Sequence, residues 1–333
     1  MIPDTAIYLF GLQGKALNAE ETAWLQHPLC AGVILFTRNF DNPAQIRAFI
    51  QTLRATAGHD ILIAVDHEGG RVQRFRNGFT AIPAMATLGQ RYEQNPNDAK
   101  RYAGDLGYVM AYEIGDCDID FSFAPVLDVQ TDFSEIIGDR GFHHNVAVIA
   151  ELAGAFYQGM RQAGTIGVGK HFPGHGNVVA DSHLTLPVCE ADFATLTHRD
   201  LPPFKALIQA GIEAIMPAHI LYTQVDGMPA GFSTYWLQSV LRQQLGFDGC
   251  IISDDLDMAG AAAYGDMPAR IELAAHNCDL ILLCNNAEGM RQAFNSLTPQ
   301  ADAKRQARLT ALKRDKTRHD GETYQRRLAR VCT

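Results

Sequence analysis

The segment 61–74 reads ILIAVDHEGGRVQR, a short apolar run that passes at Asp66 into a polar, glycine-containing stretch. A continuous run of this kind is typical of a strand buried on both faces, as in a parallel sheet. Similar runs recur along the whole chain, at 6–12, 32–36, 61–66, 121–129, 167–172, 214–219, 250–254 and 280–284. The sequence therefore predicts eight strands of a parallel sheet.

Amphipathic helical patterns separate these runs. In 43–56 the apolar residues recur at spacings of three and four, and Asn42 followed by Pro43 is typical of a helix start. Further helices are expected at 146–163, 201–210 and 234–245. Alternation of eight strands with helices predicts an α/β fold, a (β/α)8 barrel in a single domain. The alternative is a doubly wound open sheet, which the absence of GxGxxG after the first strand disfavours.

Composition excludes several classes of protein. The 333 residues carry a net charge of -9, which argues against a general nucleic-acid binder because phosphate neutralisation needs a basic surface. The N-terminal residues lack the features of a signal peptide, and no apolar run is long enough to cross a membrane. Seven dispersed cysteines without a CxxC pair favour a reducing compartment. We expect a cytoplasmic protein that is a monomer and binds neither nucleic acid nor membranes.

The end of the chain differs in charge from the rest. Residues 301–333 hold ten Lys+Arg and four Asp+Glu, whereas residues 1–300 are strongly acidic. We expect a catalytic barrel at 1–300 and a basic helical tail at 301–333 that packs on it. An RNA- or membrane-binding arm is the alternative, and it is poorly supported because Tyr324 is the tail's only Phe, Trp or Tyr residue.

Polar residues follow the predicted strands, where a barrel of this type places its chemistry. Asp66 and Asp128 each have a structural interpretation, Asp66 as a turn cap and Asp128 as an acceptor of hydrogen bonds from backbone N–H groups. We favour the structural interpretation for Asp128 but not for Asp66. A buried Lys170 beside His171 is costly unless it is paired, so a functional role is favoured there. The remaining candidates that follow strands are Arg74, Arg140, His219, Asp254 and Asp255.

The pair Asp254 and Asp255 ends the seventh run. Successive side chains of a strand point to opposite faces, so one of the two should face the barrel mouth and the other the helices. The spacing leaves open which of them faces the mouth.

The longest informative loop is 170–187, KHFPGHGNVVADSHLTLP. Asp181 and His183 are two residues apart, and a carboxylate beside an imidazole can fix its tautomer and stabilise its protonated form. Such a pair is suited to proton transfer near neutral pH. Gly174 and Gly176 give the loop backbone freedom, as expected of a loop that closes over the mouth.

Three motifs occur in barrel order between residues 60 and 258: VDxEGGRVxR, KHFPGHG followed by DSH, and IxSDDLxM. Together they resemble the family 3 glycoside hydrolases, and within that family the bacterial single-domain β-N-acetylhexosaminidases of cell-wall recycling. The resemblance implies a retaining, exo-acting enzyme that removes N-acetylglucosamine from peptidoglycan fragments. It implies no cofactor and no metal.

The resemblance also implies a role for each matching residue. Asp254 matches the nucleophile, and His183 matches the general acid/base with Asp181 as its partner. The residues that match those holding the terminal N-acetylglucosamine are Asp66, Arg74, Arg140, Lys170 and His171.

Three other functions compete with this interpretation. A metal-dependent hydrolase is suggested by His67, His171, His219 and Asp254, but Lys170 would lie beside the metal. A phosphorylase of the same family would transfer the sugar to phosphate. A catalytically inactive sugar-binding protein is disfavoured because Asp254, Asp181 and His183 are all present.

Overall fold

All eight strands expected from the apolar runs form in the computed structural model, which describes residues 1–131, 134, 136–176, 178, 186–298 and 300–332. They are β1 (Tyr8–Gly11), β2 (Cys30–Leu35), β3 (Leu62–Val65), β6 (Phe121–Ser122), β7 (Val168–Phe172), β9 (Ala214–Pro217), β11 (Cys250–Ile251) and β12 (Ile281–Leu283).

These strands form a closed parallel barrel. One sheet has the order β12-β1-β2-β3-β6 and the other the order β11-β9-β7. Single parallel bridges join the sheets, from Phe121 to Ile166 and Val126 to Lys170 on one side and from Ile252 to Leu280 on the other. The chain is a (β/α)8 barrel, and an open doubly wound sheet is excluded because both edges are closed.

The expected strand at 121–129 is wrong in its length. β6 ends at Ser122, and beyond it the backbone pairing with β7 is limited to a bridge between Val126 and Lys170 and a hydrogen bond from the amide of Val168 to Ala124 O. Pro125 has no amide hydrogen and cannot donate to a ladder, which explains why an apolar run does not continue as a strand here. Asp128 consequently lies in a loop beyond the strand.

Alternate strand residues fill the barrel interior. Leu62 and Ala64 of β3, Val168 of β7 and Ile252 after β11 belong to one buried cluster. Their neighbours Ile63, Val65 and Ile251 belong to the larger cluster between the strands and the helices. This alternation shows which strand residues point into the barrel and which point toward the helices. We use the same alternation to place the polar residues that follow each strand.

The expected helices at 43–56, 146–163 and 201–210 form as α2 (Pro43–Ala57), α5 (Val146–Gln162) and α7 (Leu201–Gln209). Asn42 caps α2, since its side chain accepts a hydrogen bond from the amide of Gln45. The helix expected at 234–245 forms at Tyr235–Gln244 with π-type turns. Helices that the patterns did not indicate are α1 (Ala19–Leu25), α3 (Met85–Gln94), α4 (Pro96–Asp116), α6 (Phe193–Arg199), α8 (Ala259–Ala262), α9 (Met267–Ala275) and α10 (Ala287–Ser296).

Short elements lie outside the barrel strands. A hairpin of β4 (His67–Gly69) and β5 (Val72–Gln73) follows β3 directly, and β8 (Val188–Cys189) pairs with β10 (Leu221–Tyr222). Single 3₁₀ turns occur at Thr37–Asn39, Gly138–Arg140, Ala230–Phe232 and Lys316–Arg318. None of the described helices is both long and apolar enough to cross a membrane.

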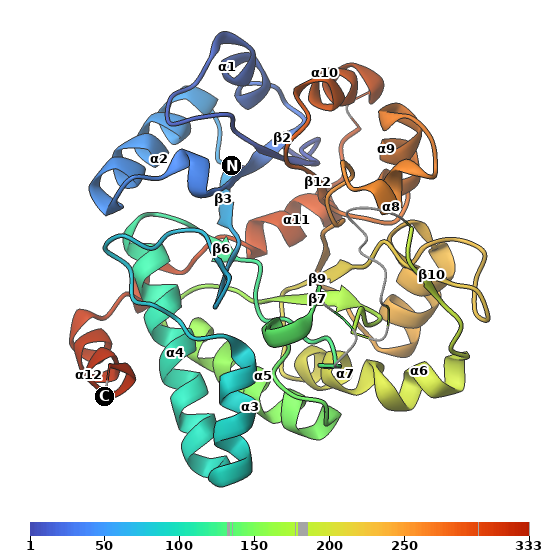
Figure 1. Cartoon of the computed structure of the whole chain (residues 1–333). Helices are drawn as coiled ribbons and strands as arrows, with labels where there is room; N and C mark the ends of the chain where they lie inside the picture. The colour runs from blue at the N-terminus through green and yellow to red at the C-terminus, as the bar shows by residue number, and fades with distance from the viewer. Residues whose placement is uncertain (132–133, 135, 177, 179–185, 299, 333) are drawn as a thin grey trace.

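The C-terminal helices lie against the barrel (Figure 1). α11 (Ala303–Ala311) buries Leu309 in the interior cluster, and Leu312 follows it there. α12 (Gly321–Val331) packs on α4, where Tyr324 stacks on Tyr112 with ring centroids 4.2 Å apart. Basic residues of the tail pair with acidic residues of the barrel, as Arg308 does with Asp279 and Lys313 with Asp60, while the boundary at residue 300 stays a prediction.

Candidate active site

Asp66 follows the last residue of β3 and shares the inward face of Leu62 and Ala64. The chain then turns back through the β4–β5 hairpin, where Gly69 has a φ of +113°. A Cβ at Gly69 would lie 2.7 Å from the carbonyl oxygen of Pro83, so a larger residue does not fit. The hairpin returns Arg74 to the strand end, where its Nη2 lies 3.3 Å from Asp66 Oδ2.

A buried charge network joins three strand ends. Lys170 Nζ, at an inward position of β7, lies 2.5 Å from Glu68 Oε1 and 3.3 Å from Asp66 Oδ1. Arg140 approaches Glu68 from the loop after β6, with Nε and Nη2 each 2.8 Å from a carboxylate oxygen. The ion-pair partners that a buried Lys170 needs are therefore present.

Glu68 holds this network together. Its side chain is only 4% exposed. Burial alone would raise its pKa, but the charges of Arg140 and Lys170 outweigh burial and hold the pKa of Glu68 well below its usual range. An ionised Glu68 thus fixes two cations while leaving N–H groups of each for a ligand.

The loop after β6 contributes a second buried carboxylate. Asp128 accepts hydrogen bonds from the amides of His171 (3.1 Å) and His175 (2.6 Å), and its Oδ2 lies 2.6 Å from His171 Nδ1. Burial opposes its charge, but His171 and the other donors lower the pKa of Asp128. This contact confirms the structural interpretation of Asp128, and it orients the ring of His171 beside Lys170.

The alternation of β11 distinguishes the two adjacent aspartates. Cys250 and Ile252 lie in the barrel interior, so Asp254 continues the inward series. Asp255 instead uses Oδ1 to accept the amides of Asp257 and Cys284, both at 3.1 Å. Burial, followed by the charges of Asp257 and Asp254, raises the pKa of Asp255 to about 7.

Several carboxylates lie near one another at this end of the barrel. The thiol of Cys284, next to β12, is buried, and the charges of Asp255, Asp66 and Asp254 add to that burial in raising its pKa. The structure thus brings together Asp66, Arg74, Arg140, Lys170, His171 and Asp254 around one end of the barrel. Asp181 and His183 lie outside the described residues.

The histidines proposed for a metal site do not converge. His67 packs against Phe75 and Phe79, and burial lowers its pKa to about 3. His171 is directed to Asp128, and His219 packs on Phe232. Among the residues that the structure describes, no group of three His, Cys, Asp or Glu side chains is placed to hold a metal ion.

Sequence reasoning missed the role of Glu68, which is not among the site residues predicted above. The signal was present: Glu68 is an acidic residue two positions after Asp66, and residues two apart in a strand share a face. The second missed feature is the use of Ser253, Asp255 and Asp257 as acceptors for β12, which needs the register between β11 and β12.

Comparison with known proteins agrees with this geometry. Residues 5–312 match the model of the glycosyl hydrolase family 3 N-terminal domain. The β-hexosaminidase of Methylobacillus flagellatus is 49% identical over 301 residues, covering 90% of this chain and 86% of that protein. The β-hexosaminidase of Mannheimia succiniciproducens is 49% identical over 310 residues, covering 91% of this chain and 89% of that protein.

A solved structure is similar over nearly the whole chain. NagZ from Neisseria gonorrhoeae, in complex with N-trifluoroacetyl-D-glucosamine, superposes with a TM-score of 0.91 at 37% identity. The match covers 98% of this chain and 97% of the gonococcal chain. The similarity therefore includes every element that positions the site.

Proposed function

We propose that this chain, which belongs to glycosyl hydrolase family 3 and is a β-hexosaminidase, removes terminal β-linked N-acetylglucosamine from peptidoglycan fragments. The reaction proceeds with retention through a covalent glycosyl-enzyme. The fragments are those in which N-acetylglucosamine is joined to anhydro-muramic acid, with or without peptide.

The observation that carries this proposal is the buried network of Asp66, Glu68, Lys170 and Arg140 at the mouth. Neutral sugar hydroxyls need donors and acceptors held in fixed positions, and charged partners form the stronger hydrogen bonds. Asp66 accepts from hydroxyls, whereas Lys170 and Arg140 donate to them. Arg74 and His171 complete this proposed sugar site at its edges.

Asp254 is the proposed nucleophile. Its carboxylate attacks the anomeric carbon and the glycosidic bond breaks, which gives a glycosyl ester. The proton on the leaving oxygen comes from His183, whose imidazolium Asp181 stabilises. His183, now neutral, then takes a proton from water, which attacks the ester and releases the sugar. An imidazole with a pKa near ~6.5 serves both steps at neutral pH.

The proposed substrate is supported by the ligand that a relative binds. The gonococcal protein was solved with an N-acylated glucosamine, which supports an N-acetylated sugar as the ligand of this chain. The muramic acid part of the substrate follows from the motifs shared with cell-wall recycling enzymes.

The test compares a chromogenic β-N-acetylglucosaminide with the matched β-glucoside. We expect turnover of the first and little of the second. The disaccharide of N-acetylglucosamine and anhydro-muramic acid, incubated in phosphate buffer, should yield free N-acetylglucosamine. Formation of the sugar 1-phosphate instead would contradict hydrolysis and identify a phosphorylase.

A further inference from the structure

Side chains take over part of the ladder between β11 and β12 at the barrel mouth. The chain after β11 still donates backbone hydrogen bonds to β12, from Ser253 N to Leu280 O and from Leu256 N to Leu282 O. The amide of Leu280 returns a bond to Ile251 O, but beyond it the return bonds go to side chains. They run from Leu282 N to Ser253 Oγ (3.0 Å), from Cys284 N to Asp255 Oδ1 (3.1 Å) and from Asn286 N to Asp257 Oδ2 (3.1 Å).

This side-chain ladder is formed by Ser253, Asp255 and Asp257, which are spaced two residues apart in the segment after β11. Asp254 lies between the first two of them in the chain. The bonds therefore fix the backbone on both sides of Asp254 without occupying the mouth.

Further bonds connect the ladder to Asp254 itself. Asp255 Oδ1 also accepts the amide of Asp257 (3.1 Å), and Asp257 Oδ2 also accepts the amide of Asn285 (3.0 Å). Asp254 Oδ1 in turn accepts the amide of Asp255 at 2.8 Å. The carboxylate proposed to attack the sugar is thus bonded to the residue that the ladder holds.

We propose that Asp255 and Asp257 are positioning residues for Asp254, holding its carboxylate at attacking distance by anchoring the chain to β12. This inference rests on the proposed function, because it takes Asp254 as the nucleophile. A displacement of about 1 Å of a reacting group can cost on the order of 10²-fold in rate. Loss of one anchor should therefore lower kcat while leaving the sugar contacts of β3 and β7 in place.

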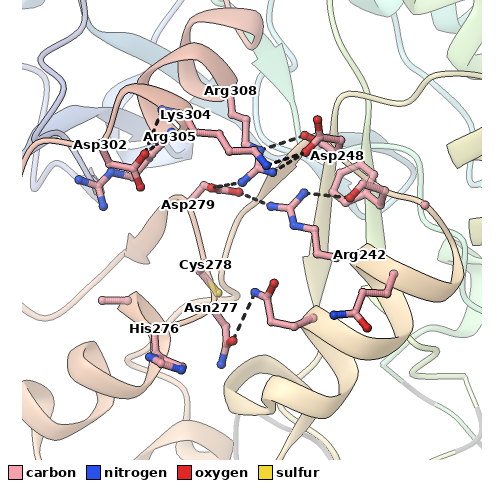
Figure 2. A pocket seen from close by; sticks show the side chains of 15 residues that line it. Arg242, Asp248, His276, Asn277, Cys278, Asp279, Asp302, Lys304, Arg305 and Arg308 are labelled. Atoms are coloured by element: carbon pink, nitrogen blue, oxygen red, sulfur yellow. Dashed lines mark hydrogen bonds and ion pairs between the residues drawn. The ribbon is translucent and has the colours of Figure 1, made fainter.

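The chain supplies a matched control at the other end of the same pair of strands. Asp279, which precedes β12, accepts the amide of Ile251 at 2.8 Å. It also pairs with Arg242 (2.7 Å) and Arg308 (2.9 Å), as Figure 2 shows. Removing Asp279 deletes the same type of carboxylate-to-amide bond between β11 and β12, but away from the mouth.

The experiment measures kcat, KM and Tm for Asp255→Ala, Asp257→Ala and Asp279→Ala with a chromogenic β-N-acetylglucosaminide, well below every melting temperature. We expect the first two variants to lose about 10- to 100-fold in kcat with KM changed less than about twofold. Asp279→Ala should lose at least as much Tm with kcat within about twofold. If Asp279→Ala does not fold, Arg308→Ala, which removes one of the two ion pairs of Asp279, replaces it as the destabilised control away from the mouth.

Conservative variants provide the second readout. Asp255→Asn and Asp257→Asn keep an oxygen that accepts the amides, so they should recover most of the lost kcat. Unchanged kcat in both alanine variants would overturn the inference. So would a loss of kcat that follows Tm equally in all three alanine variants. If Asp254→Asn also retained full activity, the proposed function itself would fail, which separates the two failures.

Discussion

At the scale of the single residue, Glu68 decides whether the sugar site is assembled. Glu68→Gln leaves Lys170 and Arg140 without their shared carboxylate, and a buried charge that loses its partner is strongly unfavourable. We expect kcat/KM to fall by a factor corresponding to about 2–4 kcal/mol, together with a clear loss of Tm.

Lys170→Ala and Arg140→Ala serve as comparison variants for Glu68→Gln. Each should cost about 2–4 kcal/mol in transition-state binding, because each removes one desolvated charged contact to the sugar. Steady-state kinetics on a β-N-acetylglucosaminide checks all three. Wild-type kcat/KM in Lys170→Ala and Arg140→Ala would remove these residues from the sugar site.

Asp255 makes stability depend on pH. Its pKa is raised to about 7 in the folded protein, above the value of about 3.9 in an unfolded chain. The folded state therefore holds this proton more tightly, and the stability it contributes is present below about pH 4 and lost as the pH rises through 7. Asp255→Asn does not titrate, so it should lack this loss, which amounts to at most about 4 kcal/mol.

Urea unfolding of both proteins at several pH values between 4.5 and 8 measures this difference. The free energy of unfolding of the wild type should fall relative to that of Asp255→Asn across this range. Parallel curves for the two proteins would show that Asp255 is not the responsible group.

At the level of single residues, the sequence predicts which buried charges need an ion-pair partner. It does not predict which of two adjacent side chains points into the barrel. A lysine at a buried strand end needs a carboxylate, so pairing of Lys170 could be predicted. Which of Asp254 and Asp255 faces inward depends on register, because a shift of one residue exchanges the two faces. The structure resolves this through Cys250 and Ile252, which lie in the interior.

At the scale of the element, the loop from β7 to β8 carries the proposed acid. A sugar alkoxide is a poor leaving group and needs the proton from His183, whereas a nitrophenolate does not. His183→Ala should therefore lose far more activity on a disaccharide than on a nitrophenyl glycoside. On the activated substrate a burst should appear, and azide should speed release of the sugar because it needs no general base.

Asp181→Asn is the matched variant for this loop. It should show the same pattern more weakly, because Asp181 is proposed to orient the imidazole without carrying the proton. Equal losses on both substrates without rescue by azide would assign His183 to binding instead of proton transfer. The sequence would then offer His175, His219 and Glu68 as the acid, but Glu68 is ionised between Arg140 and Lys170, which leaves the two histidines.

Elements could be predicted where apolar periodicity is regular. The eight runs indicated eight strands, and α2 was predicted with its cap because Asn42 and Pro43 act locally. The run at 121–129 failed because Pro125 interrupts the ladder, although its side chains are as buried as those of a strand. Burial and pairing are separate properties, and hydrophobicity reports only the first.

At the scale of the whole molecule, α12 should stabilise the barrel without taking part in chemistry. Arg330 Nε and Nη2 each lie 2.6 Å from an oxygen of the buried Asp105, and Arg327 lies over the ring of Tyr108. Arg327 Nη1 also lies 3.6 Å from Asp105, so a chain ending at residue 319 loses both cations together with the stacking of Tyr324 on Tyr112. We expect a loss of about 2–4 kcal/mol in stability, the scale of charge-assisted hydrogen bonds plus one aromatic pair.

Denaturant unfolding and steady-state kinetics check this truncation together. The value of kcat/KM should stay within about twofold of the full chain, because α12 packs on the outer helix α4. Arg326→Ala is the control: within the part of the chain that the structure describes, the Arg326 side chain donates only to Thr323 on the same helix, and its loss should change stability by less than about 0.5 kcal/mol. A truncated protein as stable as the full chain would contradict the role of α12.

We propose that catalysis passes through a covalent glycosyl-enzyme formed on Asp254. The most direct measurement uses an N-acetylglucosaminyl donor with a good leaving group and a ring fluorine that slows breakdown of the ester, followed by mass spectrometry of the digested protein. We expect one sugar residue attached through an ester to Asp254, and no attachment in Asp254→Asn. Attachment to Asp255, or turnover of the donor without any adduct under conditions where breakdown is slow, would contradict it.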